Sequence, residues 1–325
     1  MNRVCPNHAA PVQGDEAERW KALQAVSTPH TPFCRLDYVR AVASGAGLHL
    51  GIHIVSENGQ DMAGAAVTWK RRGPWREAIV PPFTPFSAVT LRDALNPADI
   101  HSRTTPLESL LAELEAGYDR IHVHLDPEYT DIRPAQWRGW TTRPLYTYRL
   151  NTGDGPETWS KGAARTFRSG KDAYDLLEGN GVGSTAALLA AASYARQGRK
   201  TPLDKAALEA LVRTVENTGL ASSFAVRRRD SGDIQAGIVV LHANRKGYYW
   251  VVGSVPGPAM TVLLGKMLPR LHASGIEEFD LMGANTPTIA EFKRRFGARL
   301  TSYYRIGFCR KPMLQWLCTL REMRR

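Results

Sequence analysis

The chain reads IHIVSENGQDMAGAAVTWKRRG over Ile52–Gly73 and FAVRRRDSGDIQAGIVVLHANRKG over Phe224–Gly247. Each stretch has an apolar segment, a polar turn, an Ala-Gly pair that opens a second β-branched segment, and a basic turn that ends in glycine. Short apolar runs separated by turn residues predict β-hairpins. Aligning Ala63 with Ala236 gives an offset of 173 residues. This self-similarity predicts two related units in one chain.

A helix and a further strand follow each hairpin in the same order. Leu107–Ala116 has the spacing of an amphipathic helix and precedes a strand over Arg120–Leu125, whereas Val262–Ser274 is a helix that precedes a strand over Phe279–Met282. Each helix stops at a glycine, which suits the left-handed conformation at helix C-termini. We therefore predict an α/β (α+β) protein with two tandem units, each a mixed twisted sheet flanked by helices.

The joint between the units is predicted near Asn151–Glu157, which reads NTGDGPE and has turn residues without periodicity. This places one unit at residues 1–150 and the other, with a basic C-terminal segment, at residues 151–325. Three helices are expected at the start of the second unit, over Trp159–Glu178, Thr185–Arg196 and Leu203–Thr218.

Composition and cysteine usage favour an ordinary cytoplasmic protein. Hydrophobic residues make up 43% of the chain and charged residues 22%, values that argue against a disordered or coiled-coil protein. No apolar stretch reaches the length of a membrane span, and Met1–Trp20 lacks the apolar core of a signal peptide. We expect no integral membrane association. The cysteines form no C-x-x-C pair: Cys5, Cys34, Cys309 and Cys318.

The positive charge is concentrated near the C-terminus. The chain has 42 Lys and Arg against 31 Asp and Glu, and the resulting charge of +11 makes a polyanionic partner plausible. Glu291–Arg325 alone contains ten basic and two acidic residues. Such a surface can neutralise RNA phosphates, and aromatic residues among the basic ones can stack on unpaired bases. The alternative is a solvated arginine-rich surface.

Several common motifs are missing or fail in context. Gly257–Lys266 lacks the spacing of a phosphate-binding P-loop, and Gly179–Gly183 follows an expected helix instead of a strand. The chain has no G-x-S-x-G and no H-E-x-x-H sequence. His122 and His124 project from one face of a strand, a spacing that can chelate a metal, but no third ligand accompanies them. We therefore predict no metal.

A set of further segments occurs in a characteristic order: Tyr146–Leu150, Ser160–Arg165 with Arg168 and Lys171, Phe279–Gly283, Phe292-Lys293 and Phe296-Gly297. In this order they resemble the FemAB/FemX-like branch of the GNAT acyltransferases. The resemblance covers the chain from about Pro32 to Phe308 and is best in the second unit. It implies a tandem of two GNAT folds.

The resemblance also implies an activity and some of its residues. The best-known members transfer an amino acid from aminoacyl-tRNA to an amine, and other tandem GNAT proteins use acyl-CoA. In the tRNA users a Phe-Lys pair contacts the tRNA end and the reacting carbonyl region, and this pair matches Phe292 and Lys293. Asp126, before Pro127, resembles another family feature, and Arg40 has a weaker counterpart among substrate-binding residues.

The candidate catalytic residues are Lys293, Asp126 and Asp280. Aminoacyl transfer passes through an intermediate with a negative oxygen, which the Lys293 ammonium would stabilise; the alternative is a surface lysine on a helix. Asp126 would accept or orient the proton of the amine, or it is only a turn residue at the end of a strand. Asp280 is on an alternating strand and can point toward a cleft.

The candidate binding residues are basic or aromatic. Arg165, Arg168 and Lys171 recur at three-residue spacing and share one helix face, so they would hold a phosphate or carboxylate of the acceptor, or form an exposed surface. Phe292 and Arg40 complete the substrate set. The tRNA-binding set is Lys293, Arg294, Arg295 and Arg299.

These observations predict an aminoacyl-tRNA-dependent aminoacyltransferase that forms an amide on a small amine or a peptide, either a cell-wall precursor or a secondary-metabolite peptide. No cofactor is needed besides the donor. The first alternative is an acyl-CoA-dependent N-acyltransferase. The loop Gly253–Pro258 stands where many GNAT proteins bind pyrophosphate but lacks their usual spacing, which weakens this alternative. The second alternative is a non-catalytic RNA-binding protein. The chain also lacks a heptad insertion, so no coiled-coil arm is expected.

Overall fold

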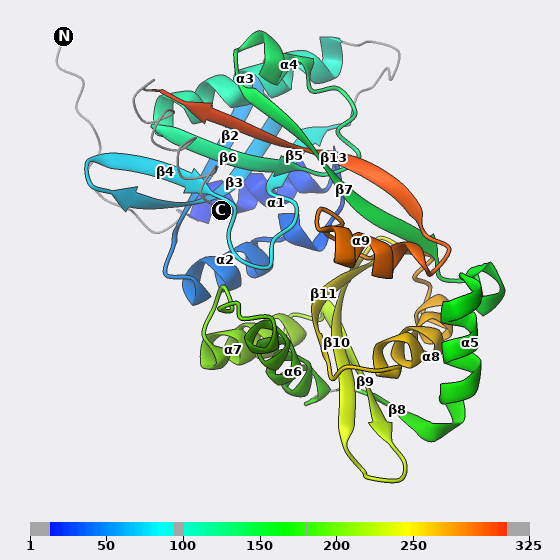
Figure 1. Cartoon of the computed structure of the whole chain (residues 1–325). Coiled ribbons are helices and arrows are strands. Elements are labelled where there is room, and N and C mark those ends of the chain that lie inside the picture. The colour runs from blue at the N-terminus through cyan, green and yellow to red at the C-terminus, as the bar shows by residue number, and fades with distance from the viewer. Residues whose placement is uncertain (1–13, 94–100, 180, 311–325) are drawn as a thin grey trace.

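The computed structural model describes residues 14–93, 101–179 and 181–310 (Figure 1). In the first part of the chain the main elements are α1 (Gly14–Gln24), β1 (Ser27–Thr28), α2 (Leu36–Gly45), β2 (His49–Glu57), β3 (Gln60–Arg72), β4 (Trp75–Ile79), β5 (Ala88–Arg92), α3 (His101–Gly117), β6 (Arg120–Leu125), α4 (Arg133–Trp137) and β7 (Thr141–Asn151).

The second part of the chain repeats much of this order. Its elements are α5 (Lys161–Gly170), β8 (Tyr174–Glu178), α6 (Val182–Arg196), α7 (Lys205–Glu216), β9 (Ala221–Arg228), β10 (Ile234–Ala243), β11 (Lys246–Ser254), α8 (Ala259–Ala273), β12 (Glu278–Asp280), α9 (Pro287–Arg294) and β13 (Arg299–Cys309). Both predicted hairpins are confirmed, because β2 pairs antiparallel with β3 and β9 with β10. The predicted helix and strand after each hairpin are also present, as α3 with β6 and as α8 with β12.

Two local expectations were wrong. The helix expected over Trp159–Glu178 ends at Gly170, and Tyr174–Glu178 instead forms β8, the edge strand that pairs with β9. Pairing with β9 along all five residues of β8 outweighs the helix-compatible composition of this segment. The strand expected over Phe279–Met282 ends at Asp280, because Met282 has a φ of +59°, which is incompatible with a β-strand.

The described strands form one continuous 13-stranded sheet in which the two parts meet through β7 and β13. The long strand β13 pairs antiparallel with β6 of the first part and with β7, while β7 pairs on its other edge with β12 of the second part. The two expected sheets are therefore joined edge to edge. The boundary between residues 150 and 151 falls within the last two residues of β7. That the two parts are separate domains stays a prediction.

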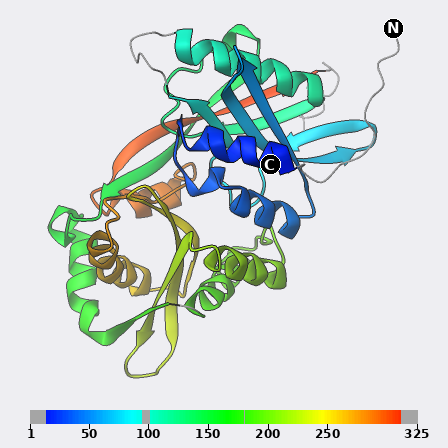
Figure 2. The ribbon, with the colours of Figure 1, turned by 180° about the vertical axis from the view of Figure 1, so that it is seen from behind.

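Helices cover both faces of the sheet (Figures 1 and 2). One hydrophobic cluster joins α1 and α2 to α6 and α7, with Trp20 and Val42 from the first part and Leu208 and Val212 from the second. Two further clusters lie under α3 and under α5 with α8. Because one core contains side chains from both parts, their relative position is fixed by buried apolar contact.

Helix α6 packs unusually close to the sheet. A Cβ added to Gly253 of β11 would lie 2.1 Å from the backbone nitrogen of Ala190, and one added to Gly237 of β10 would lie 3.0 Å from the Cα of Ala186. Glycine at these positions lets the helix backbone approach the strands. The approach matters because α6 forms one wall of the cleft described below.

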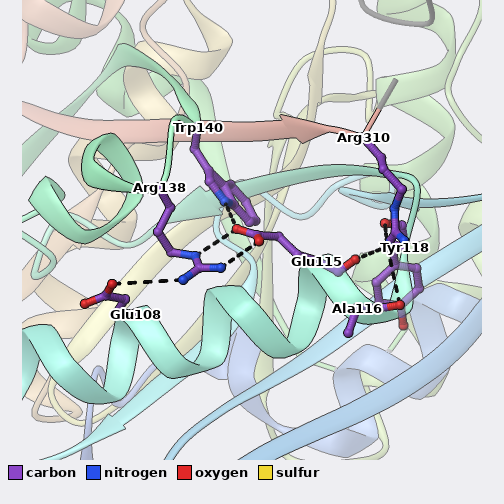
Figure 3. A network of polar contacts seen from close by, with 7 residues as sticks. All are labelled: Glu108, Glu115, Ala116, Tyr118, Arg138, Trp140 and Arg310. Atoms are coloured by element: carbon purple, nitrogen blue, oxygen red, sulfur yellow. Dashed lines mark hydrogen bonds and ion pairs between the residues drawn. The ribbon is translucent and has the colours of Figure 1, made fainter. Parts of the chain in front are cut away.

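A polar network fastens the end of β13 to α3 (Figure 3). Arg310 follows β13 and donates to the backbone carbonyls of Glu115, Ala116 and Tyr118 at the C-terminus of α3. The Glu115 carboxylate accepts hydrogen bonds from Arg138, at 2.8 and 2.7 Å, and from the indole of Trp140 at 2.7 Å. Burial alone would raise the pKa of Glu115, but these donors hold it below its usual value.

Replacing Glu115 with alanine is expected to lower the free energy of unfolding by about 2 kcal/mol, because the buried Trp140 indole and the Arg138 guanidinium lose their acceptor. Chemical denaturation followed by tryptophan fluorescence measures this loss. The matched control is Glu108→Ala on the same helix, since Glu108 lies 4.0 Å from Arg138 and is half exposed. Equal stability of the two variants would contradict the structural role given to Glu115.

Within the described residues, no helix is long and apolar enough to cross a membrane. Cys34 is a buried free thiol. Cys5 and Cys318 lie outside the described residues.

Candidate active site

The sheet opens between two parallel strands of the second part. Strands β11 and β12 pair only where Lys246–Tyr248 faces Glu278–Asp280, and beyond this point they separate. A cleft of about 1010 Å³ begins here, and its lining includes Met282, Gly283 and most of β11 after Tyr248, namely Tyr249, Trp250, Val252, Gly253 and Ser254. A volume of this order accommodates a ligand of cofactor size.

Both parts of the chain contribute to the cleft. The first part supplies the β4–β5 loop, residues 80–85, and His124 of β6, while the second part supplies α6, α9 and Tyr303 of β13. Figure 1 shows α9 at the junction of the two parts. Among the described residues that line the cleft, none carries a carboxylate, whereas Lys293 and Arg199 carry cationic groups. The lining favours an anionic ligand.

Lys293 occupies the wall of this cleft, although only 6% of the residue is exposed. Its Nζ donates hydrogen bonds to the carbonyl oxygens of Met282, at 2.6 Å, and Gly283, at 2.9 Å, and lies 5.2 Å from the centre of the Tyr249 ring. Burial lowers the pKa of Lys293 to about 8, against the opposing effect of the Asp280 charge. A lysine ammonium has three N–H donors, so one remains for a third acceptor.

Asp280 supports the turn that holds Lys293 and does not line the cleft. Its carboxylate accepts hydrogen bonds from Arg149 Nε at 2.9 Å, from the Thr147 hydroxyl, and from the backbone N–H of Met282 at 2.8 Å. The last bond secures the left-handed conformation of Met282, whose carbonyl then points at Nζ of Lys293. The structure thus places Asp280 behind the site, and a direct catalytic role stays a prediction.

Asp126 also lies outside the cleft lining. It follows β6, is 2% exposed, and accepts a hydrogen bond from the Glu128 backbone N–H through Oδ1. Within the described part of the chain, its Oδ2 has no hydrogen-bond partner. Burial raises the pKa of Asp126 to about 7, although the charge of Arg149 opposes the shift. The structure does not bring Asp126 to the cleft wall beside Lys293, and its proton-transfer role remains untested.

The predicted binding residues divide into one that lines the cleft and several that do not. Phe292 lines the cleft and packs edge-on against Phe296, with ring centroids 5.0 Å apart. The exposed basic residues lie outside the cleft lining: Arg40 on α2, Arg165 and Arg168 on α5, Lys171 just after α5, Arg294 and Arg295 at the end of α9, and Arg299 at the start of β13. Residues 311–325 of the basic segment lie outside the described residues. The binding roles stay predictions.

The exposed charge beside α9 is partly neutralised. Glu291 accepts hydrogen bonds from Arg294 at 2.6 and 3.1 Å and from Arg295 at 3.4 Å. These contacts within one helix are weak in water, so both guanidinium groups can exchange Glu291 for a phosphate.

The loop before α8 forms another side of the cleft. Val255, Pro256 and Gly257 line it, as does Met260 in the first turn of α8. Pro258 is the N-cap of the helix and provides no side-chain cap. Backbone N–H groups at a helix N-terminus favour phosphate and other anions. The loop lacks the glycine spacing that is usual in GNAT proteins, but the N-terminus of α8 can still bind an anion.

Sequence reasoning missed the β4–β5 loop as part of the site. Phe83 of this loop has a φ of +57°, and its carbonyl accepts hydrogen bonds from Tyr38 and from the Trp250 indole, each at 2.9 Å. Trp250 belongs to β11, so this contact connects the first part of the chain to the cleft strand. The feature of the sequence that could have indicated this loop is the proline-rich run PPFTP at residues 81–85.

His122 and His124 lie on the same face of β6, as predicted. No group of three or more His, Cys, Asp or Glu among the described residues is arranged to hold a metal ion. Absence of a metal from the reaction stays a prediction. The two histidines differ in position, because His124 lines the large cleft and His122 does not.

Residues 163–294 match the family described as acetyltransferase (GNAT) domain. A crystal structure of FemX superposes with a TM-score of 0.67 at 12% sequence identity, over 89% of this chain and 95% of that chain. The chain is a GNAT-fold protein. L-PGS from Bacillus licheniformis gives a TM-score of 0.57 at 10% identity, over 95% and 96% of the two chains.

A tandem GNAT protein from the clavulanic acid biosynthesis pathway gives a TM-score of 0.54 at 13% identity, over 93% and 98% of the chains. No curated protein sequence matches this chain. The structures therefore confirm the predicted tandem GNAT fold, which is an acyltransferase fold, and its likeness to FemX.

The Asp280→Asn substitution is expected to destabilise the protein by about 3 kcal/mol, because it breaks a buried pair and leaves the Arg149 guanidinium with only the partly exposed Glu278, 3.4 Å away, as an ionic partner. Urea unfolding measures this effect. Asp154→Asn is the control, because Asp154 is exposed and its change should alter stability by less than about 0.5 kcal/mol. A fully stable Asp280→Asn protein would show that Asp280 does not secure the turn.

Proposed function

We propose that this protein is an aminoacyltransferase that takes an aminoacyl group from tRNA and forms an amide bond on an amine held in the cleft. The observation that carries this proposal is the buried Lys293 ammonium, which two carbonyls hold at the point where β11 and β12 separate. The acceptor belongs to the class of small amines and peptides, including cell-wall precursors and secondary-metabolite peptides.

The chemistry requires positioning and stabilisation of one negative oxygen. The amine nitrogen attacks the ester carbonyl carbon, a C–N bond forms, and the electron pair of the carbonyl π bond moves to oxygen. The third N–H of Lys293 would donate to that oxygen, which is where charge develops. Collapse of the intermediate breaks the ester C–O bond, and the proton lost by the amine ends on the ribose hydroxyl. No covalent enzyme intermediate is needed, because the donor ester is already activated.

The choice of tRNA as donor rests on charge and on the resemblance to the FemX family. Exposed Arg294 is the last residue of α9, which carries Lys293 into the cleft wall, and exposed Arg295 and Arg299 follow this helix. Phosphates bound there would place the 3′ end of an RNA near Phe292, whose ring is available to stack on a base. The absence of carboxylates among the described cleft-lining residues further supports an anionic donor.

An acyl-CoA donor is the second candidate, and one observation favours it. The first turn of α8 and the preceding loop line the cleft and suit a pyrophosphate. A non-catalytic RNA-binding protein, the third candidate, would not require Lys293.

Transfer from a pool of tRNA charged with labelled amino acids to amines of a cell extract tests the proposed function. We expect labelled amide products and RNA binding that weakens steeply as salt increases. Product formation from acetyl-CoA but not from charged tRNA would establish the second candidate. Tight tRNA binding without any product, unchanged in Lys293→Ala, would establish the third.

The Lys293→Ala substitution is expected to lower kcat by about 100-fold or more, because the oxyanion loses a charged donor. Lys205→Ala serves as the control, since Lys205 is an exposed lysine at the start of α7. Steady-state kinetics with labelled aminoacyl-tRNA measure both variants. A Lys293→Ala enzyme with near-normal kcat would remove this residue from the mechanism.

The activity is also expected to decline as pH rises through about 8, since the pKa of Lys293 lies near that value and only the protonated form is cationic. A pH profile of kcat in wild type and Lys293→Arg measures this limb. Arginine keeps its charge over this range, so any residual activity of Lys293→Arg should lack the decline. The same alkaline limb in both proteins would assign it to another group.

A further inference from the structure

We propose that Nε2 of His124 accepts a hydrogen bond from the attacking amine and takes its proton as the amide bond forms. The inference rests on the proposed function for its reaction, but the amine site itself has an independent test. Four observations support it: the position of His124 in the cleft, the hydrogen bond that fixes its tautomer, its surroundings, and the lack of a competing base.

The position of His124 is set by β6. The strand brings it from the first part of the chain to the cleft that Lys293 of the second part also lines. Its ring lies edge-on to Tyr303, with centroids 6.3 Å apart, and Tyr303 also lines the cleft. An amine bound beside His124 would therefore share one cleft with an acyl group held at Lys293.

The tautomer of His124 follows from its backbone contact. Nδ1 lies 3.1 Å from the carbonyl oxygen of Pro85. A carbonyl only accepts hydrogen bonds, so Nδ1 must carry the proton, and the neutral ring then presents a lone pair at Nε2. Pro85 belongs to the β4–β5 loop, which itself lines the cleft.

The surroundings keep His124 neutral. Burial lowers its pKa to about 4; the hydrogen bond to Pro85 opposes this shift, and the charge of Arg305 adds to it. The charged or titratable groups around it are Arg305 and Tyr303 on β13 and His122 on β6. An imidazole that stays neutral throughout the physiological pH range remains an acceptor for N–H.

The described lining of the cleft offers no better base. It contains no aspartate or glutamate, and both Asp126 and Asp280 lie outside it. Lys293 donates its N–H groups to carbonyls and serves the oxyanion. Within the described cleft, Nε2 of His124 can thus accept the proton, and Lys293 remains a hydrogen-bond donor to the oxyanion.

The proton balance is complete without another reactant. The neutral amine attacks the acyl carbon, and the new C–N bond leaves a positive charge on nitrogen. Nε2 takes one proton and becomes imidazolium, and the ester C–O bond breaks. The imidazolium, which has a low pKa, returns the proton to the leaving ribose oxygen. Amide and free hydroxyl are released, and the ring is neutral again.

The amine site is tested first without a donor. Nitrogen-15 NMR of imidazole-labelled wild-type protein at pH 7 to 9 is expected to show His124 as the neutral Nδ1–H tautomer. Added glycinamide, the amine probe, should shift the His124 Nε2 resonance and leave that of His122 unchanged. Protonated His124, the Nε2–H tautomer, or no selective shift would each overturn the inference, whether or not any transfer is detected.

Chemical rescue tests the proton transfer. His124→Ala should lower kcat about 100-fold, and added imidazole should restore at least a tenth of the wild-type rate. His122→Ala is the matched control on the same strand face; it should neither lose as much activity nor respond to imidazole. A folded His124→Ala enzyme with a normal rate, or one that imidazole does not rescue, would contradict the inference.

Failure of the proposed function and failure of the role of His124 give different results. A selective glycinamide shift at His124, with no transfer from charged tRNA or acetyl-CoA by wild type, would reject the proposed function and keep the amine site. Transfer by wild type that is insensitive to His124→Ala would keep the proposed function and reject the role of His124. Circular dichroism and thermal melting of both alanine variants establish that they are folded.

Discussion

The buried pair of Asp280 and Arg149 is the interaction on which the site depends. It connects β12 to β7, and the same carboxylate holds the backbone of Met282 in a conformation unfavourable for a bulky residue. That turn directs two carbonyls at the Lys293 ammonium. The ion pair therefore acts through geometry, because it holds the turn whose carbonyl oxygens fix the position of the Lys293 ammonium.

The cleft is a property of both parts of the chain together. The second part supplies the diverging strands and Lys293, while the first supplies His124 and the β4–β5 loop. The hydrogen bond from Trp250 to Phe83 and the shared core of α1, α2, α6 and α7 fix the positions of these groups relative to one another. A second, related unit is thus a structural requirement for the proposed reaction, since one unit alone would present an open-sided groove.

The sequence allowed prediction of the elements whose signals are local. The hairpins at Ile52–Gly73 and Phe224–Gly247 have alternation and turn residues, and Lys293 was found through the resemblance of its neighbours. The pairing of β7 with β13 joins residues far apart in the chain, and no local pattern specifies it. Likewise, Asp280 was expected to face a cleft because strand alternation cannot reveal that Arg149 covers it. His124 was considered only as a metal ligand, because its tautomer depends on Pro85.

The late position of β13 in the chain has a consequence for biosynthesis. On the ribosome, β6 is made long before its partner strand, so one edge of the first sheet waits unpaired while the second part is translated. Exposed strand edges promote association between chains. The edge of β6 is therefore open to such contacts during this interval, and the cleft is complete only when β13, which supplies Tyr303, has been added.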